Sequence, residues 1–151
     1  MKKIAETERL LVFENDGWEY VERKKGKEAV VVLAQDEKGA VILVEQLRRP
    51  VNARVIDFPA GLIGDEGGSS DPAETAKKEL EEETGYSCDR VQLLAKGTTS
   101  PGITSEIVSF YRAEGVRRTG PGGGVGGESI EVHTVNPQEL PEWLRAREKE
   151  G

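Results

Sequence analysis

Cysteine is nearly absent from this sequence: among 151 residues it occurs once, as Cys88. No disulfide bond can therefore form within the chain. We expect Cys88 to be a small, half-buried apolar residue rather than a nucleophile.

Long apolar runs are missing as well. No stretch approaches the ~20 residues that a membrane-spanning helix needs. Residues 1–8 also lack the apolar segment of a signal peptide. We therefore expect a cytoplasmic protein with no membrane partner.

Positive charge is in deficit, with 21 lysines and arginines against 28 acidic residues and a net charge of −7. This balance argues against a general nucleic-acid binder, which would need a basic face. An acidic protein that binds an anionic substrate needs local cations, which a metal ion and arginine would supply. The length fits one domain over residues 1–151 with a sizeable core.

The pattern of residues 57–86 predicts a short strand, a glycine-rich loop and then a helix dense in carboxylates. Asp71 is a typical N-cap, Pro72 suits the first helical position, and Glu74 completes an arrangement similar to a capping box. Gly85 is a natural C-cap.

Three glutamates of this helix, Glu79, Glu82 and Glu83, stand at positions i, i+3 and i+4 and so share one face. Like charges at this spacing repel one another. A divalent cation would remove the repulsion, and hard oxygen ligands suit Mg²⁺ or Mn²⁺. The alternative is a solvated acidic face.

The helix resembles the second half of the motif of the Nudix hydrolases, in the run Lys78-Glu-Leu-Glu-Glu-Glu-Thr-Gly-Tyr86. Upstream, the run Phe58-Pro-Ala-Gly-Leu-Ile63 is similar to the lead-in of the ADP-ribose pyrophosphatase branch, which makes Gly61 the motif glycine. The following loop, 64–70, then carries three extra residues. Strict spacing would instead select Gly64.

Two departures from the family pattern coincide: Lys78 replaces an arginine, and Ser70 replaces a glutamate. The resemblance implies that the missing pair braces the loop against the helix. Losing both together is coherent, because a lone buried charge would be costly. We expect Asp65, Glu66 or Asp71 to pair with Lys78.

The resemblance implies an α+β fold, a Nudix-type α-β-α sandwich with a mixed sheet, preceded by an N-terminal β-hairpin in residues 1–27. The order of expected elements independently favours a layered α+β domain. The implied ligands of Mg²⁺, or of Mn²⁺, are the Ala60 carbonyl, Glu79, Glu82 and Glu83.

Several residues outside the helix resemble the branch's substrate-binding positions. Arg48 aligns with a diphosphate-contacting arginine, with Arg49 as the fallback, and a guanidinium fork suits such a group. Trp18 and Glu19 are similar to a pair that recognises adenine, often across the interface of a homodimer. The remaining candidates are Pro101, Gly102 and Glu106, although Glu106 is also a plain surface charge and Trp18 a plain packing residue.

The proton acceptor should be a carboxylate apart from the metal ligands. Glu128 is the candidate, acting with Glu82 and Glu83 in catalysis, and Glu131 or Glu106 is the alternative. The preceding loop, 116–127, is rich in glycine and predicts either a flexible connection or a mobile loop that carries Glu128 into the site.

The rest of the chain predicts strands and one more helix. We expect strands over Leu10–Phe13, 18–22, Ala29–Leu33, Ala40–Val44, Val91–Ala95, Glu106–Arg112 and Glu128–Val135, and a helix over 137–150. Asn136 would cap this helix, and Leu140, Trp143 and Leu144 form its apolar stripe, so we expect Trp143 in the core. We expect His133 to be structural and Arg54 structural or solvated.

The implied reaction is hydrolysis of the diphosphate linkage of a nucleoside diphosphate sugar, with ADP-ribose giving AMP and ribose 5-phosphate. One alternative is the same chemistry on GDP-mannose, a UDP-sugar, a dinucleoside polyphosphate or an oxidised nucleotide. Another is a non-catalytic module that senses a nucleotide, which the three intact helix glutamates disfavour.

Overall fold

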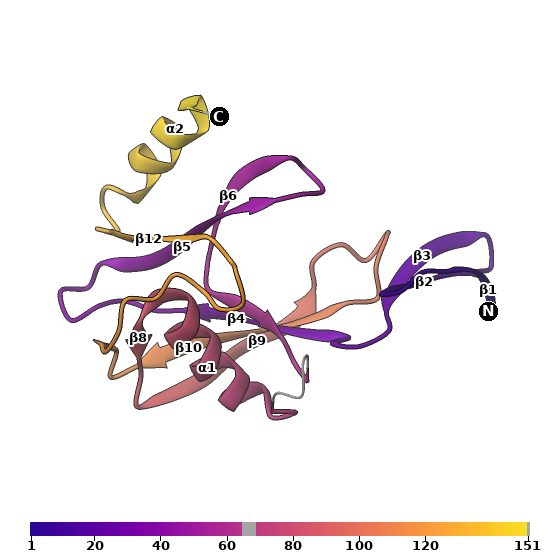
Figure 1. The fold of residues 1–151 in the computed structure, drawn as a ribbon, viewed down its shortest axis with the longest axis horizontal. Helices are drawn as coiled ribbons and strands as arrows, with labels where there is room; N and C mark the ends of the chain where they lie inside the picture. The colour runs from indigo at the N-terminus through magenta and orange to yellow at the C-terminus, as the bar shows by residue number, and fades with distance from the viewer. Residues whose placement is uncertain (65–68, 151) are drawn as a thin grey trace.

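The computed structural model describes residues 1–64 and 69–150, which form layers of strands and helices with one projecting sheet (Figure 1). In chain order the elements are β1 Lys2–Glu6, β2 Leu10–Asn15, β3 Trp18–Arg23, β4 Glu28–Leu33, β5 Val41–Arg48, β6 Ala53–Asp57, β7 Ala60–Leu62, α1 Pro72–Thr84, β8 Tyr86–Ser87, β9 Arg90–Thr98, β10 Ile107–Glu114, β11 Arg117–Arg118, β12 Ile130–Val135 and α2 Leu140–Glu150.

A mixed sheet lies at the centre, with the strand order β7-β4-β10-β9. Strands β4 and β10 are parallel, whereas β7 and β9 pair antiparallel with their neighbours. Val30 and Val32 of β4 are fully buried against Leu80 of α1 and neighbouring apolar side chains. Burial of such side chains is the main favourable contribution to this layer.

Helix α1 begins and ends where the sequence predicts. The Asp71 side chain accepts a hydrogen bond from the Ala73 amide at 2.8 Å, and Pro72 occupies the first turn. Gly85 has φ 73°, a left-handed conformation that glycine adopts at little cost, and its amide donates to the Glu81 carbonyl. The predicted N-cap and C-cap are confirmed. The arrangement expected with Glu74 is not, because the Asp71 amide donates to Ser69 Oγ at 3.0 Å instead.

A second sheet, ordered β12-β5-β6, is antiparallel throughout. Alternate residues of β5 point to opposite faces of this sheet. The buried Ile42 and Val44 share one face with Gln46 and Arg48, while Glu45 belongs to the other. Helix α2 lies beside this sheet, on the side away from α1 (Figure 1). A mixed sheet with helical layers confirms the predicted α+β class.

Helix α2 begins at Leu140, three residues later than the sequence predicts, after a turn closed by the Asn136 carbonyl and side chain. Trp143 is half-buried and packs edge-on against His133, with ring centroids 5.0 Å apart. The expectation that Trp143 joins the core is therefore wrong. Its neighbour in α2, Leu144, is 41% exposed.

Residues 1–23 form a three-stranded sheet that projects from the body (Figure 1). The sequence predicts only the hairpin of β2 and β3, and β1 is an addition. The projecting sheet joins the body where the Val21 amide donates to the Ile103 carbonyl at 2.9 Å and Arg23 pairs with Glu106. Within the described residues, no helix has the length and apolar character needed to cross a membrane.

Candidate active site

A cleft of about 780 Å³ opens beside α1 and gathers seven of the predicted site residues. Its wall includes apolar residues of β4 and β10, namely Ala29, Val31, Val108 and Phe110. The predicted residues that line it are Arg48, Ala60, Glu79, Glu82, Glu83, Glu106 and Glu128. The cleft therefore brings carboxylates from one helix and two other segments together with an arginine from β5.

Glu83 is the most buried of these carboxylates, with only 5% of its surface exposed. Its side chain accepts a hydrogen bond of 3.0 Å from the Ala60 amide. Burial, and to a smaller degree the nearby charges of Glu79 and Glu128, raises the pKa of Glu83 to about 8, against the weaker opposing effects of the Ala60 amide and Arg48. Burial beside other carboxylates disfavours the ionised form of Glu83, and a bound cation would favour it.

Glu79 lies directly against Gly61 of β7. A Cβ atom at Gly61 would stand 2.1 Å from the Glu79 carboxyl carbon, far inside van der Waals contact. At Gly64 a Cβ atom would meet no described residue within 4 Å. Of the two candidate motif glycines, Gly61 is the one whose missing side chain makes room for a helix carboxylate. This fits the assignment of Gly61 that the resemblance implies.

Lys78 finds a partner inside the acidic row: its Nζ lies 3.0 Å from Glu82 Oε2. The Asp71 side chain, one of the three expected partners, instead caps α1. Asp65 and Glu66, the other two expected partners, lie outside the described residues. The Lys78–Glu82 pair is largely solvated, and its contribution to stability is about 0.5 kcal/mol or less.

The three candidates for the proton acceptor, Glu128, Glu131 and Glu106, lie in different places. Glu128 lies in the turn before β12 and lines the cleft. Glu131 lies on β12 opposite Glu45, on the face of the second sheet away from the cleft, where its carboxylate is 3.7 Å from Arg54. Glu106 lines the cleft but is paired with Arg23, Nε to Oε1, at 2.8 Å.

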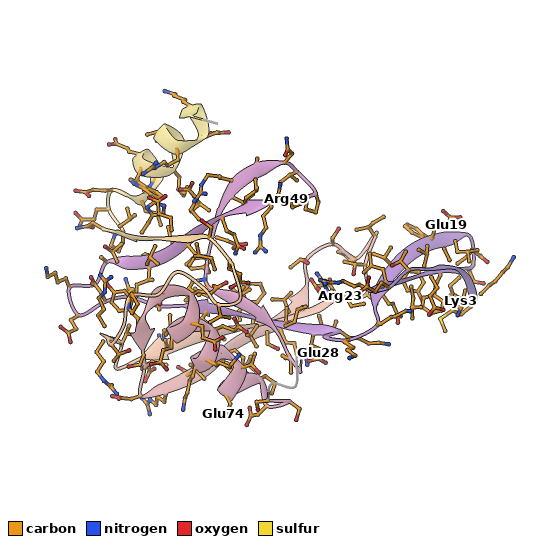
Figure 2. The ribbon with its side chains drawn as sticks, in the orientation of Figure 1. Lys3, Glu19, Arg23, Glu28, Arg49 and Glu74 are labelled. Carbon is orange, nitrogen blue, oxygen red and sulfur yellow. The ribbon has the colours of Figure 1, made fainter. Side chains whose placement is uncertain are left out.

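The remaining predicted substrate residues lie outside this cleft. Trp18, Glu19, Pro101 and Gly102 line a separate hollow of about 460 Å³ beside the projecting sheet. The Trp18 side chain is 68% exposed there. Figure 2 shows Glu19 on the projecting sheet, far from the body, and Arg49 at the connection that follows β5. Arg49 lines neither hollow.

Two arginines of the cleft wall, Arg9 and Arg23, are absent from the sequence-based candidates. Arg9 precedes β2 in an irregular connection, where no motif or periodicity marks it. Arg23 ends β3, and Figure 2 shows it where the projecting sheet meets the body. Its position depends on how that sheet is attached, which local sequence does not reveal.

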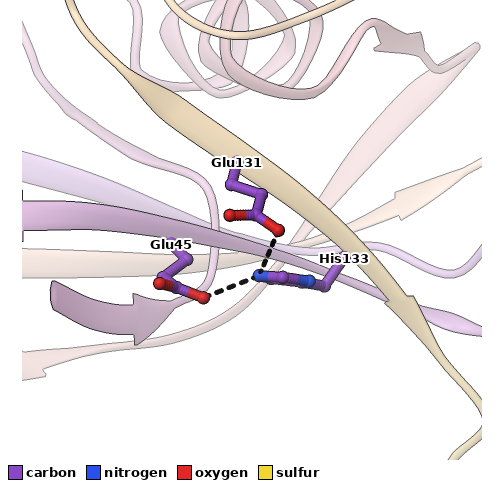
Figure 3. A group of neighbouring side chains, drawn as sticks. All are labelled: Glu45, Glu131 and His133. Carbon is purple, nitrogen blue, oxygen red and sulfur yellow. Dashed lines mark hydrogen bonds and ion pairs between the residues drawn. The ribbon is translucent and has the colours of Figure 1, made fainter. Parts of the chain in front are cut away.

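A second polar cluster lies on the outer face of the sheet β12-β5-β6 (Figure 3). His133 Nε2 is 2.9 Å from Glu45 and 3.9 Å from Glu131. Possible ligand atoms of these three residues lie within 4.8 Å of one another, a spacing compatible with a metal ion. The Arg54 guanidinium already pairs with Glu45, and this contact, more than any other, holds the pKa of Glu45 below its usual range.

A sequence model of the NUDIX domain matches residues 25–150 of the chain. The methanol dehydrogenase activator of Bacillus methanolicus is 41% identical over 90 residues, which cover 60% of this chain and 47% of that protein. The ADP-ribose pyrophosphatase of Bacillus subtilis is 42% identical over 86 residues, covering 57% of this chain and 45% of that protein.

The GDP-mannose pyrophosphatase of Yersinia pestis is 33% identical over 96 residues, covering 60% of this chain and 46% of that protein. The aligned segments thus span less than half the length of these relatives. A crystal structure of an ADP compounds hydrolase superposes on 95% of this chain and 80% of its own, with a TM-score of 0.71 and 20% identity. That similarity shows a shared fold.

Proposed function

The chain belongs to the NUDIX domain family, and on that premise we propose that it hydrolyses the diphosphate linkage of a nucleoside diphosphate sugar. The proposed substrate is ADP-ribose, which one water molecule converts to AMP and ribose 5-phosphate. The observation that carries the proposal is the buried carboxylate of Glu83, set among other acids in a cleft that also holds Arg48. A diphosphate repels an attacking nucleophile, so its hydrolysis needs a site that binds cations close to the phosphates.

The residues present fit a divalent metal ion. Glu79, Glu82 and Glu83 lie on one turn of α1 and all line the cleft. With the Ala60 carbonyl they form the proposed ligand set for Mg²⁺ or Mn²⁺, which prefer hard oxygen ligands. When bound, the ion would neutralise the diphosphate and acidify water.

The other residues of the cleft have distinct proposed tasks. The Arg48 guanidinium binds the diphosphate oxygens as a planar fork. Glu128 takes the proton of the attacking water, because it is a cleft carboxylate apart from the ligand set. Glu106, oriented by Arg23 at 2.8 Å, accepts a hydrogen bond from a ribose hydroxyl. Arg49 is the fallback for Arg48.

The nucleotide base requires a further surface, and the separate hollow at Trp18 and Glu19 is the proposed one. Pro101 and Gly102 share that hollow. Because it is distinct from the cleft of the same chain, we propose that these residues serve the cleft of a second copy in a homodimer. An aromatic ring stacked on a base contributes about 1–3 kcal/mol. The cytoplasmic location remains a prediction from the sequence.

Two relatives carry names with different substrates, ADP-ribose and GDP-mannose, so a substrate panel tests the proposal. Release of phosphate would be followed with a coupled phosphatase, with Mg²⁺, for ADP-ribose, GDP-mannose, a UDP-sugar, a dinucleoside polyphosphate and an oxidised nucleotide. ADP-ribose should have the highest kcat/KM. Preference for another nucleotide would reassign the substrate, and binding without hydrolysis of any would indicate a nucleotide sensor.

The affinity for the divalent ion should increase with pH, because Glu83 must lose its proton to bind the ion. Its pKa is raised to about 8, so below that pH the ion must displace a proton. The apparent association constant should therefore rise ~10-fold per pH unit up to about pH 8 and then level off. Calorimetry in buffers of different ionisation enthalpy should detect close to one proton released per ion at pH 7.

The matched control for this titration is Glu81→Gln, which removes an exposed carboxylate of the same helix. It should leave the pH dependence as it is in the unaltered protein. An association constant that stays constant between pH 6 and pH 9 would refute the role of Glu83 as a ligand that must lose its proton.

A further inference from the structure

The glycine-rich segment between β11 and β12 is docked on the end of α1. The last carbonyls of a helix have no partner within it. Here the Gly123 amide donates to the Glu83 carbonyl at 2.8 Å, and the Gly124 amide donates to the Glu82 carbonyl at 3.1 Å. The Gly120 amide adds a bond of 3.0 Å to the Gly85 carbonyl. Part of residues 116–127 is therefore hydrogen-bonded to the end of α1. The flexibility expected for this stretch stays a prediction.

The docking depends on glycine at particular positions. Gly122 has φ 70°, and a Cβ atom there would stand 2.4 Å from the backbone carbon of Thr84. At Gly124 a Cβ atom would stand 2.6 Å from the carboxylate of Glu128. Gly126 has a similar φ of 64° but open space around it. The segment thus contains glycines that permit a close approach and at least one that serves only a turn.

The same segment holds Glu128. The Val125 amide donates to Glu128 Oε2 at 3.1 Å, and the Glu128 amide donates to the Val125 carbonyl at 3.2 Å. Val125 directly follows Gly124, whose amide is bound to the Glu82 carbonyl. Three consecutive backbone amides, at residues 123–125, therefore connect α1 to Glu128. The first two donate to the carbonyls of two proposed metal ligands, and the third donates to the carboxylate proposed as proton acceptor.

We propose that Gly122 and Gly124 are positioning residues for catalysis. They let residues 120–124, here called the glycine strap, lie against α1, and the strap holds the Glu128 carboxylate at a set place relative to Glu82 and Glu83. The proposal rests on the proposed function, because it takes Glu128 as the group that accepts the proton. Misplacing a catalytic group by about 1 Å can lower a rate ~10²-fold.

The test compares Gly122→Ala with Gly126→Ala, which impose similar backbone strain but differ in contact with α1. For ADP-ribose with Mg²⁺, Gly122→Ala should lower kcat ~10- to 100-fold while KM and Mn²⁺ affinity change less than ~3-fold. Gly126→Ala should lower kcat less than ~3-fold. Hydrogen exchange at the Gly123 and Gly124 amides should accelerate only in Gly122→Ala. Should Gly122→Ala not fold, Gly124→Ala takes its place.

Combination with Glu128→Gln separates positioning from general damage. If the strap acts through Glu128, Gly122→Ala should lower the residual kcat of Glu128→Gln by less than ~3-fold, because the two changes remove one interaction. Equal losses in both backgrounds, or equal losses for Gly122→Ala and Gly126→Ala, would overturn the proposal. An unaltered protein without hydrolytic activity would refute the proposed function instead, and the exchange measurement would still show whether the strap is docked through Gly122.

Discussion

Replacing Glu83 with glutamine should lower the hydrolysis of ADP-ribose at least ~10³-fold, since a proposed metal ligand is lost while the shape of the side chain is kept. Glutamine retains an oxygen that can accept the hydrogen bond of the Ala60 amide, which Glu83 accepts at 3.0 Å. The fold should therefore survive. The measurement is kcat/KM with saturating Mg²⁺, checked by circular dichroism of the variant.

The same substitution should stabilise the protein when no divalent ion is present. Glu83 keeps its proton up to about pH 8 in the folded chain but ionises near its ordinary pKa when unfolded. Ionisation thus favours unfolding, and stability is lost as the pH rises between these two values. Glutamine removes this penalty, so Glu83→Gln should raise the free energy of unfolding by about 3 kcal/mol at pH 7 and by much less at pH 4.

Urea unfolding with EDTA at the two pH values measures this difference. Glu81→Gln is the matched control, because Glu81 lies on the same helix but is exposed, and it should change stability by less than ~0.5 kcal/mol. If Glu83→Gln were less stable than the unaltered protein at pH 7, the burial argument would be contradicted. If it hydrolysed ADP-ribose at the full rate, the assignment of Glu83 as a metal ligand would be contradicted.

Replacing Glu128 with glutamine should lower kcat by ~10²- to 10⁴-fold, the usual contribution of a general base. Glutamine can still accept the Val125 amide, which Glu128 accepts at 3.1 Å, so the strap should stay docked. Because the residue is outside the proposed ligand set, KM and Mn²⁺ affinity should change less than ~3-fold. Steady-state kinetics with ADP-ribose and a Mn²⁺ titration measure the two effects.

Glu131→Gln provides the control for that experiment. Glu131 is three residues further along but faces Arg54 on the other side of the sheet, so its loss should lower kcat less than ~3-fold. Full activity in Glu128→Gln would remove Glu128 as the base. Glu106, the other candidate that lines the cleft, would then be the next residue to replace.

The helix of the site could be predicted closely because its signals are local. Asp71, Pro72 and Gly85 mark its ends, and the spacing of its glutamates puts them on one face whatever the rest of the chain does. The strand β1 and the late start of α2 were not predicted. Strand β1 is exposed throughout and pairs with the adjacent β2, so no apolar alternation marks it. The turn that Asn136 closes moves the start of α2 to Leu140.

The glycine strap shows a second limit of sequence analysis. A run of glycines has no side-chain periodicity, so the sequence predicts a flexible connection. Its docking depends on close backbone approach to Thr84 and on amides that meet the carbonyls of Glu82 and Glu83. These contacts exist only once α1 and β12 are placed side by side.

The grouping of the candidate site residues could be predicted in part. The acidic residues and Arg48 meet in one cleft, whereas Trp18 and its neighbours line another hollow. The sequence of one chain does not specify whether two such surfaces belong to one site, because a second copy can supply the missing part. Arg9 and Arg23 enter the cleft through the attachment of the projecting sheet, a long-range feature.

Binding of Mn²⁺ to the metal-free protein, followed by the electron paramagnetic resonance signal of the free ion at pH 8, shows whether the glutamates of α1 hold a metal ion. We expect at least one bound ion per chain in the unaltered protein and none at the same concentrations in the folded double variant Glu82→Gln with Glu83→Gln. Identical binding curves for the two proteins, or no binding to the unaltered protein even with ADP-ribose present, would contradict this expectation.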